Sequence, residues 1–149
     1  MVLYRITNAL YANDLSGMGA RLYGGRWNSE GRSALYLASS RSLAILESLA
    51  HIVPTNIPDD LVMLTIETPN DYFEVAVNSL PPYWREDRAS DALKQIGNAF
   101  LLENQHLLLK IPSVIVPEEY NYLMNSLHAN INQVKVLNQS RFNFDCRLL

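Results

Sequence analysis

The sequence predicts an α+β fold, with a mixed or antiparallel sheet as its core and helices beside the sheet. Segments with the alternation and β-branched residues of strands outnumber those with helical spacing. They do not alternate regularly with helices, as they would in a doubly wound parallel sheet. A length of 149 residues and a hydrophobic fraction of 48% suit a single domain, 1–149, with a substantial core.

The first half of the chain is expected to hold two strands, a long loop and a helix. Residues 2–7 alternate apolar and polar, which is typical of a strand. Residues 13–31 contain five of the six glycines and are too irregular for a helix or strand, so we expect an ordered loop. The apolar segment 34–38 predicts the next strand. Ser39 or Ser40 can then cap a helix over 41–53.

The second half mixes strands with one long helix. Residues 61–67 and 72–77 have the composition of strands, and Pro81 and Pro82 break the chain after them. Residues 90–103 carry apolar side chains on one side, which predicts an amphipathic helix. Shorter elements complete the prediction: strands at 107–111 and 114–116, a turn or short helix at 118–124, and strands at 134–137 and 142–144.

Composition and charge argue against several kinds of protein. The net charge is −3 and the isoelectric point is near 5.5, without the clustered Lys and Arg that nucleic acids and anionic membranes attract. The lone Cys146 excludes an internal disulfide and a thiolate metal cluster. No apolar run reaches the length of a membrane span, and the N-terminus has no signal-peptide pattern. We expect a cytoplasmic protein without a bound metal.

Glu47 is the residue that folding alone explains least. Its neighbours from Leu43 to Val53 are apolar nearly all round, so the helix is expected to be buried. An ionised carboxylate in such a place needs a partner. It could pair with a nearby arginine or hydroxyl for structural reasons, or it could sit at the floor of a pocket and stabilise a cationic transition state. His51, one turn later, is expected to support it by a hydrogen bond.

Arg26 and two tyrosines could bind a ligand with a phosphate and an aromatic ring. Arg26 follows Gly24 and Gly25, which let a backbone approach a ligand closely, and guanidinium groups bind phosphate in a bidentate way. A structural ion pair is the alternative. Tyr23 and Tyr36 could stack on a ring, although core packing also explains them. The glycines match neither a Walker loop nor a dinucleotide-binding finger.

The chain resembles the RES-domain proteins, toxins of bacterial toxin–antitoxin pairs named for an Arg, a Glu and a Ser. The most specific segments are Gly24 to Asn28, the strand Leu35 to Ala38, and Glu47 with His51. Ile111-Pro112-Ser113 and the segment from Asn121 to His128 agree as well. The chain departs from the family pattern at Asn98, Phe100 and Ser126.

This resemblance implies an ADP-ribosyltransferase-like fold and an enzyme that consumes NAD⁺ as a substrate, with no other cofactor. The catalytic residues would be Arg26 at the pyrophosphate, Tyr36 at the nicotinamide ribose, Glu47 at the ribose cation and Ser113 beside the nicotinamide half. Further substrate-binding candidates are Arg5, Tyr23, Trp27, Asn28 and His128. The acceptor, whether water, phosphate or a protein side chain, stays open.

The resemblance also implies a partner and an effect on cells. Such toxins inhibit growth and are neutralised by an antitoxin, commonly of the helix-turn-helix type, so the resting state would be a hetero-oligomer. Two other functions stay open: a ribonuclease-type toxin, against which the acidic isoelectric point argues, and a non-catalytic binding module.

Overall fold

A seven-stranded sheet organises the chain, and the computed structural model describes residues 1–149. The strand order is β4-β5-β6-β2-β1-β3-β7, and all neighbours are antiparallel except β4 and β5. The strands are β1 (Val2–Asn8), β2 (Leu35–Ala38), β3 (Leu61–Glu67), β4 (Tyr72–Glu74), β5 (Leu108–Pro112), β6 (Tyr120–Met124) and β7 (Lys135–Arg141). The helices are α1 (Met18–Tyr23), α2 (Arg41–His51) and α3 (Ser90–Glu103). The expected α+β class is confirmed.

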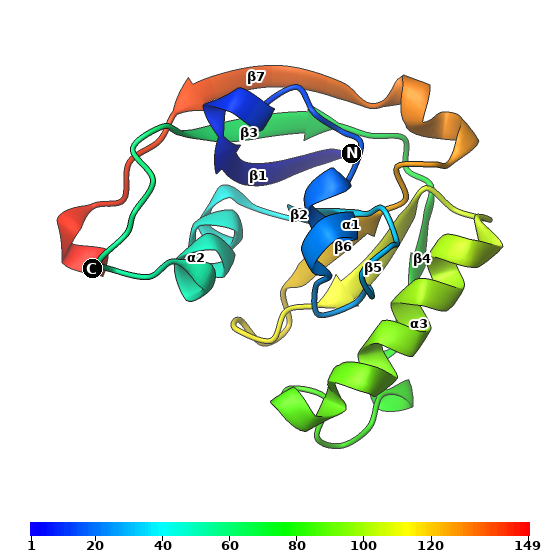
Figure 1. Cartoon of the computed structure of the whole chain (residues 1–149). Helices are drawn as coiled ribbons and strands as arrows, with labels where there is room; N and C mark the ends of the chain where they lie inside the picture. Colours follow the sequence, from blue (N-terminus) through cyan, green and yellow to red (C-terminus); the bar gives the residue numbers. More distant parts are fainter.

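The sheet is bent so that its two halves run in different directions (Figure 1). Strands β1, β3 and β7 form one half, and β2, β6, β5 and β4 form the other. Apolar side chains from both halves share one core cluster, which includes Leu3, Leu64, Leu37 and Met124. Burial of this cluster joins the two halves of the sheet.

Helix α3 packs through one apolar face on the half of the sheet that β2, β6, β5 and β4 form (Figure 1). Its residues Leu93, Gly97 and Phe100 are buried, and their spacing places them on the same side of the helix. Leu93 and Phe100 pack in one cluster with Leu109 of β5 and with Trp27. The helix therefore packs against both the sheet and the loop that follows α1.

Helix α2 forms where the sequence predicts it, but the prediction of a buried helix is wrong. Ser40 is the N-cap, and its hydroxyl accepts a hydrogen bond from the backbone N–H of Leu43 at 3.1 Å. Only Leu43 and Ala44 are buried, whereas Leu46 is 38% exposed. The helix touches the sheet along one narrow stripe, and another side borders a cleft. No helix in the structure has the length and apolar composition to cross a membrane.

Several local predictions fail where long-range pairing or glycine geometry decides the structure. The predicted loop 13–31 contains α1, which lies between Gly17 and Gly24, both with positive φ. Residues 120–124 form β6 rather than a turn or helix, because β2 and β5 pair with them on both sides. Residues 114–116 and 142–144 are not strands. Strand β4 is shorter than predicted and β7 is longer.

Candidate active site

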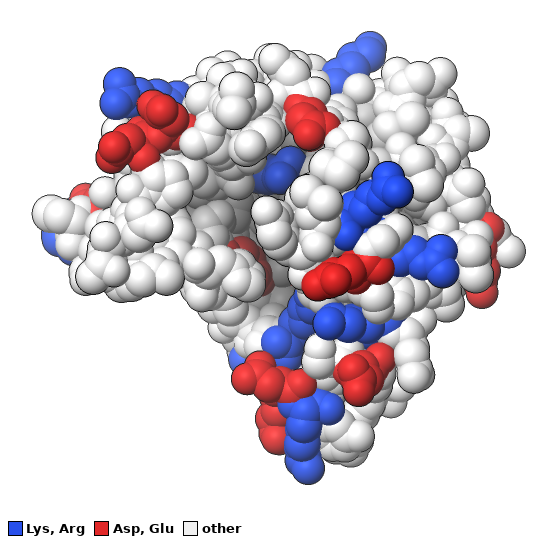
Figure 2. All heavy atoms as spheres, viewed as in Figure 1, with Lys and Arg blue, Asp and Glu red and all other residues white.

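An open cleft of about 820 Å³ lies where β1, α1, β2, α2 and the ends of β5 and β6 meet. Figure 2 shows this hollow on the face seen in Figure 1, with charged atoms inside it and mostly uncharged atoms at its rim. The charged residues that line it are Arg5, Asp14, Arg26 and Glu47. The cleft therefore combines an apolar wall with two cations and two carboxylates.

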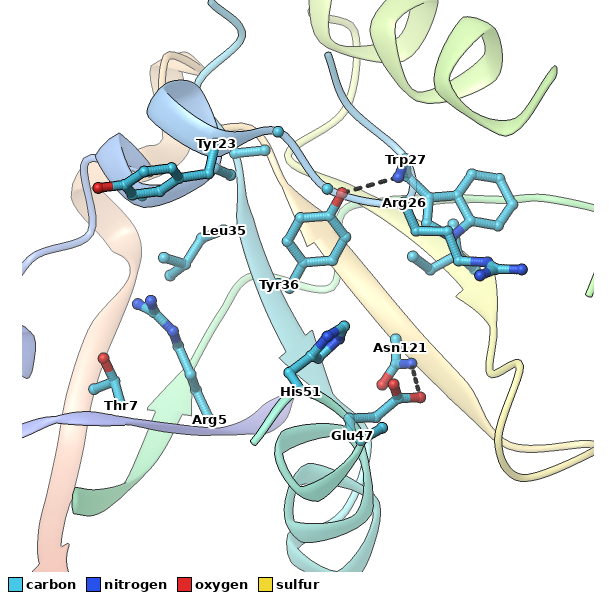
Figure 3. A pocket seen from close by; sticks show the side chains of 18 of the residues that line it. Arg5, Thr7, Tyr23, Arg26, Trp27, Leu35, Tyr36, Glu47, His51 and Asn121 are labelled. Carbon is cyan, nitrogen blue, oxygen red and sulfur yellow. Dashed lines mark hydrogen bonds between the residues drawn. The ribbon is translucent and has the colours of Figure 1, made fainter. Parts of the chain in front are cut away.

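Glu47 reaches the cleft from α2, and uncharged groups hold one of its carboxylate oxygens (Figure 3). Oε1 accepts hydrogen bonds from Ser113 Oγ at 2.8 Å and from Asn121 Nδ2 at 2.6 Å. Oε2 accepts none from the chain, and no Lys, Arg or His forms an ion pair with the carboxylate. A negative charge that is held in place but not neutralised can act on a cation in the cleft.

Arg26 shares the cleft with Glu47 and is only loosely held by the chain. Its Nη2 donates to the carbonyl oxygens of Trp84 at 3.2 Å and Glu86 at 3.5 Å. Its Nη1 lies 4.0 Å from the carboxylate of Asp87, a fully exposed side chain. The Nε group is buried and has no partner. The side chain as a whole is 31% exposed, so its Nη groups, which make only these long contacts, can turn to an anion in the cleft.

Tyr36 fixes the loop that carries Arg26. Its hydroxyl accepts a hydrogen bond from the backbone N–H of Trp27 at 3.0 Å and donates one to Asn28 Oδ1 at 2.7 Å. Burial raises the pKa of Tyr36, so the hydroxyl stays protonated at neutral pH and remains a donor. A Cβ atom at Gly25 would lie 2.6 Å from this hydroxyl. Gly25 thus makes room for Tyr36, which the sequence-based interpretation of a ligand approach did not foresee.

Arg5 and Tyr23 lie at the other end of the cleft. Figure 3 shows Arg5 on the opposite side of Tyr36 from Arg26. Arg5 makes no hydrogen bond or close ion pair within the chain; burial lowers the pKa of its guanidinium, and the carboxylate of Asp14 partly offsets this. Tyr23 is 82% exposed on α1 and lines the cleft, so its ring is free to stack on a ligand.

Three predicted site residues do not line the cleft, and the structure gives them other contacts. Asn28 is fully buried, and its Nδ2 donates to the carbonyl oxygens of Ala20 and Arg32. His128 is buried, and its Nδ1 accepts the backbone N–H of Asn130, which caps a 3₁₀ turn. Ser113 is 2% exposed and lies behind Glu47. These geometries argue against direct substrate contact by Asn28, His128 and Ser113.

Trp27 and His51 both line the cleft, but their contacts differ from those expected from the sequence, which were substrate binding by Trp27 and support of Glu47 by His51. Trp27 is 2% exposed and belongs mainly to the core under α3. His51 is exposed and makes no hydrogen bond within the chain, so the expected support of Glu47 by His51 is wrong. That support comes instead from Ser113 and, on β6, from Asn121. Its place beside Glu47 depends on the pairing of β6, which no local pattern predicts.

Comparison with known proteins gives close relatives along the whole chain. The RES domain matches residues 2–145. A protein named Toxin Res from Photorhabdus laumondii subsp. laumondii is 37% identical over 155 residues, covering 100% of this chain and 97% of that protein. The Prs ADP-ribosylating toxin of Sphingobium sp. is 37% identical over 142 residues, covering 93% of this chain and 88% of its own length.

A solved structure has the same fold. The crystal structure of the M. tuberculosis MbcT–MbcA toxin–antitoxin complex contains a chain that matches with a TM-score of 0.73 and 19% sequence identity. The match covers 95% of this chain and 83% of that one. At this identity the likeness concerns the fold, whereas the family follows from the domain match and the 37% identities. The chain belongs to the RES-domain family.

Proposed function

We propose that this chain is the toxin of a toxin–antitoxin pair and that it cleaves the bond between nicotinamide and ribose in NAD⁺. The observation that carries the proposal is the shared cleft of Arg26 and Glu47, in which one carboxylate oxygen is left free. The names of two relatives, Toxin Res and Prs ADP-ribosylating toxin, support this class of activity.

Cleavage of the nicotinamide–ribose bond needs a negative charge close to the ribose, and the carboxylate of Glu47 can supply it in this cleft. When the glycosidic bond breaks, its electron pair leaves with the nicotinamide nitrogen, and positive charge develops on the ribose carbon. A carboxylate close to that carbon stabilises the charge, as in glycoside hydrolysis. The acceptor's oxygen or other nucleophilic atom then bonds to the carbon and gives up its proton. With water the product is ADP-ribose; phosphate or a protein side chain would serve in the same way.

The other residues of the cleft suit the rest of the dinucleotide. Arg26 binds the pyrophosphate through its Nη groups, because its side chain is partly exposed and its contacts with the 84–87 loop are long. Tyr36 lines the nicotinamide-ribose end and orients the Arg26 loop. Arg5 and Tyr23 contribute a second cation and a stacking surface. NAD⁺ is then consumed as a substrate in the cytoplasm.

One assay separates this function from its alternatives. Purified protein is incubated with NAD⁺ and, in parallel, with a messenger RNA transcript. We expect free nicotinamide with intact RNA, and loss of nicotinamide release in Arg26→Ala while circular dichroism shows a folded protein. RNA cleavage at constant NAD⁺ would support a ribonuclease instead. If both substrates stay intact, the chain is a binding module. The surface on the face of Figure 2 favours the first result, since acidic and basic side chains are intermixed there.

The rim of the cleft has exposed apolar side chains that suit the binding of a protein partner. Helix α1 presents Met18, Leu22 and Tyr23 to solvent, with exposures of 43%, 57% and 82%. Exposed apolar side chains beside a reactive cleft suit a segment that covers it. The partner we propose is a helix-turn-helix antitoxin whose C-terminal part lies on this rim. Co-expression with the antitoxin should yield a stable heteromer that releases no nicotinamide; a toxin that stays fully active beside the antitoxin would contradict this.

A further inference from the structure

We infer that Asn121 is a positioning residue for Glu47: together with Ser113 it holds Oε1, so that Oε2 is the oxygen presented to the substrate. This inference rests on the proposed function and deepens it. It gives Ser113 a role behind the carboxylate, in place of the contact with the nicotinamide half that the family resemblance implied.

Ser113 has no capacity left for a substrate. Its hydroxyl oxygen accepts the backbone N–H groups of Ile115 at 3.1 Å and Val116 at 3.0 Å. A hydroxyl has two acceptor sites and one proton, and the proton is donated to Glu47 Oε1. The turn after β5 therefore fixes the Ser113 oxygen, and the hydroxyl can point only at the carboxylate.

Asn121 approaches the same oxygen from a second, rigid direction. It lies in β6 opposite Ala38 of β2 and Ile111 of β5, so the backbone is paired on both sides. Because residues in register share a face of the sheet, Asn121 lies on the same face as Tyr36, two residues before Ala38. Its amide donates to Oε1 at 2.6 Å, and Asn121 itself lines the cleft (Figure 3).

Two donors on one oxygen restrict a side chain that would otherwise rotate freely. Glu47 is on a half-exposed helix, so packing alone does not fix its carboxylate. Donors from the β5–β6 side set both the rotation of the carboxylate and its distance from the sheet. Loss of either donor misplaces Oε2, and small misplacements of a reacting group cost about 10²-fold in rate.

The test is a mutant cycle on nicotinamide release. Asn121→Ala and Ser113→Ala should each lower kcat by about 10²-fold with little change in KM, because substrate binding is not their task. In a Glu47→Ala background, measured at high enzyme concentration, neither change should lower the remaining rate further. Ser113→Thr, which keeps a hydroxyl, should recover part of the rate. A loss that persists without Glu47, or a raised KM at unchanged kcat, would overturn the inference.

Two matched controls and one measurement without NAD⁺ complete the design. Asn138→Ala changes an exposed asparagine of β7, and Ser126→Ala removes a buried hydroxyl without a partner; both should keep full activity. The side-chain amide signal of Asn121 in a ¹⁵N–¹H spectrum should move in Glu47→Ala and not in Glu103→Ala. An unchanged signal overturns the inference whether or not NAD⁺ is cleaved. A shifted signal in a protein that releases no nicotinamide supports the contact and overturns only the proposed function.

Discussion

Replacement of Glu47 by glutamine is expected to lower kcat for nicotinamide release by about 10²–10³-fold, the range seen when one electrostatic contact to a transition state is removed. Glutamine keeps the size of the side chain and an oxygen that can accept from Ser113 and Asn121. It lacks the negative charge that faces the ribose cation. Because nicotinamide departs as a neutral molecule, this charge matters in the transition state more than in the bound substrate.

The kinetic pattern distinguishes this role from a structural one. Initial rates at several NAD⁺ concentrations should show a lower kcat at a nearly unchanged KM. Glu103→Gln, at an exposed position at the end of α3, is the matched control and should behave as the wild type. A Glu47→Gln variant that releases nicotinamide at the wild-type rate would show that the carboxylate charge is not needed.

Gly97→Ala is expected to cause the largest loss of stability among single-methyl changes in this chain, about 3 kcal/mol. An added Cβ atom would lie 1.7 Å from the carbonyl oxygen of Trp27, so α3 or the loop must move. The same contact region includes Asn98, whose side chain accepts the backbone N–H of Ser29 at 3.0 Å and donates to its hydroxyl at 2.8 Å. Displacement of this loop would move Arg26 as well, so KM for NAD⁺ should rise.

Urea unfolding with and without the change measures the effect. Gly19→Ala is the matched control, because a Cβ atom there meets no other atom within 4 Å, and its free energy of unfolding should not fall. If Gly97→Ala unfolds at the wild-type midpoint with an unchanged slope, the close packing of α3 on the Trp27 loop is not a feature of the folded protein.

Elements with a strong local signal were predictable from the sequence. Residues 61–67 are strand β3 and residues 90–103 are helix α3, with the bounds expected from their composition and spacing. Strand β6 was not predictable, because its state depends on two partners distant in the chain. The prediction that α2 is buried was wrong for a similar reason. The apolar composition of a helix does not show how many of its sides the rest of the chain packs against, and in α2 only Leu43 and Ala44 are buried.

The sequence predicted which residues line the cleft better than it predicted the buried residues that hold them in place. Arg26, Tyr36 and Glu47 line one cleft, together with Arg5 and Tyr23. Residue chemistry singled out Arg26, Tyr23, Tyr36 and Glu47 in the sequence, and the family resemblance added Arg5. The resemblance placed Ser113 beside the substrate and did not distinguish such a contact from support of Glu47. That distinction needs the turn geometry at Ile115 and Val116, which appears only in three dimensions.

The most direct measurement is a crystal structure of the Glu47→Gln variant with intact NAD⁺. The expected complex places the nicotinamide ribose against residue 47 and the pyrophosphate on the guanidinium group of Arg26. NAD⁺ bound outside the cleft, or bound with its adenosine ribose at residue 47, would contradict the account.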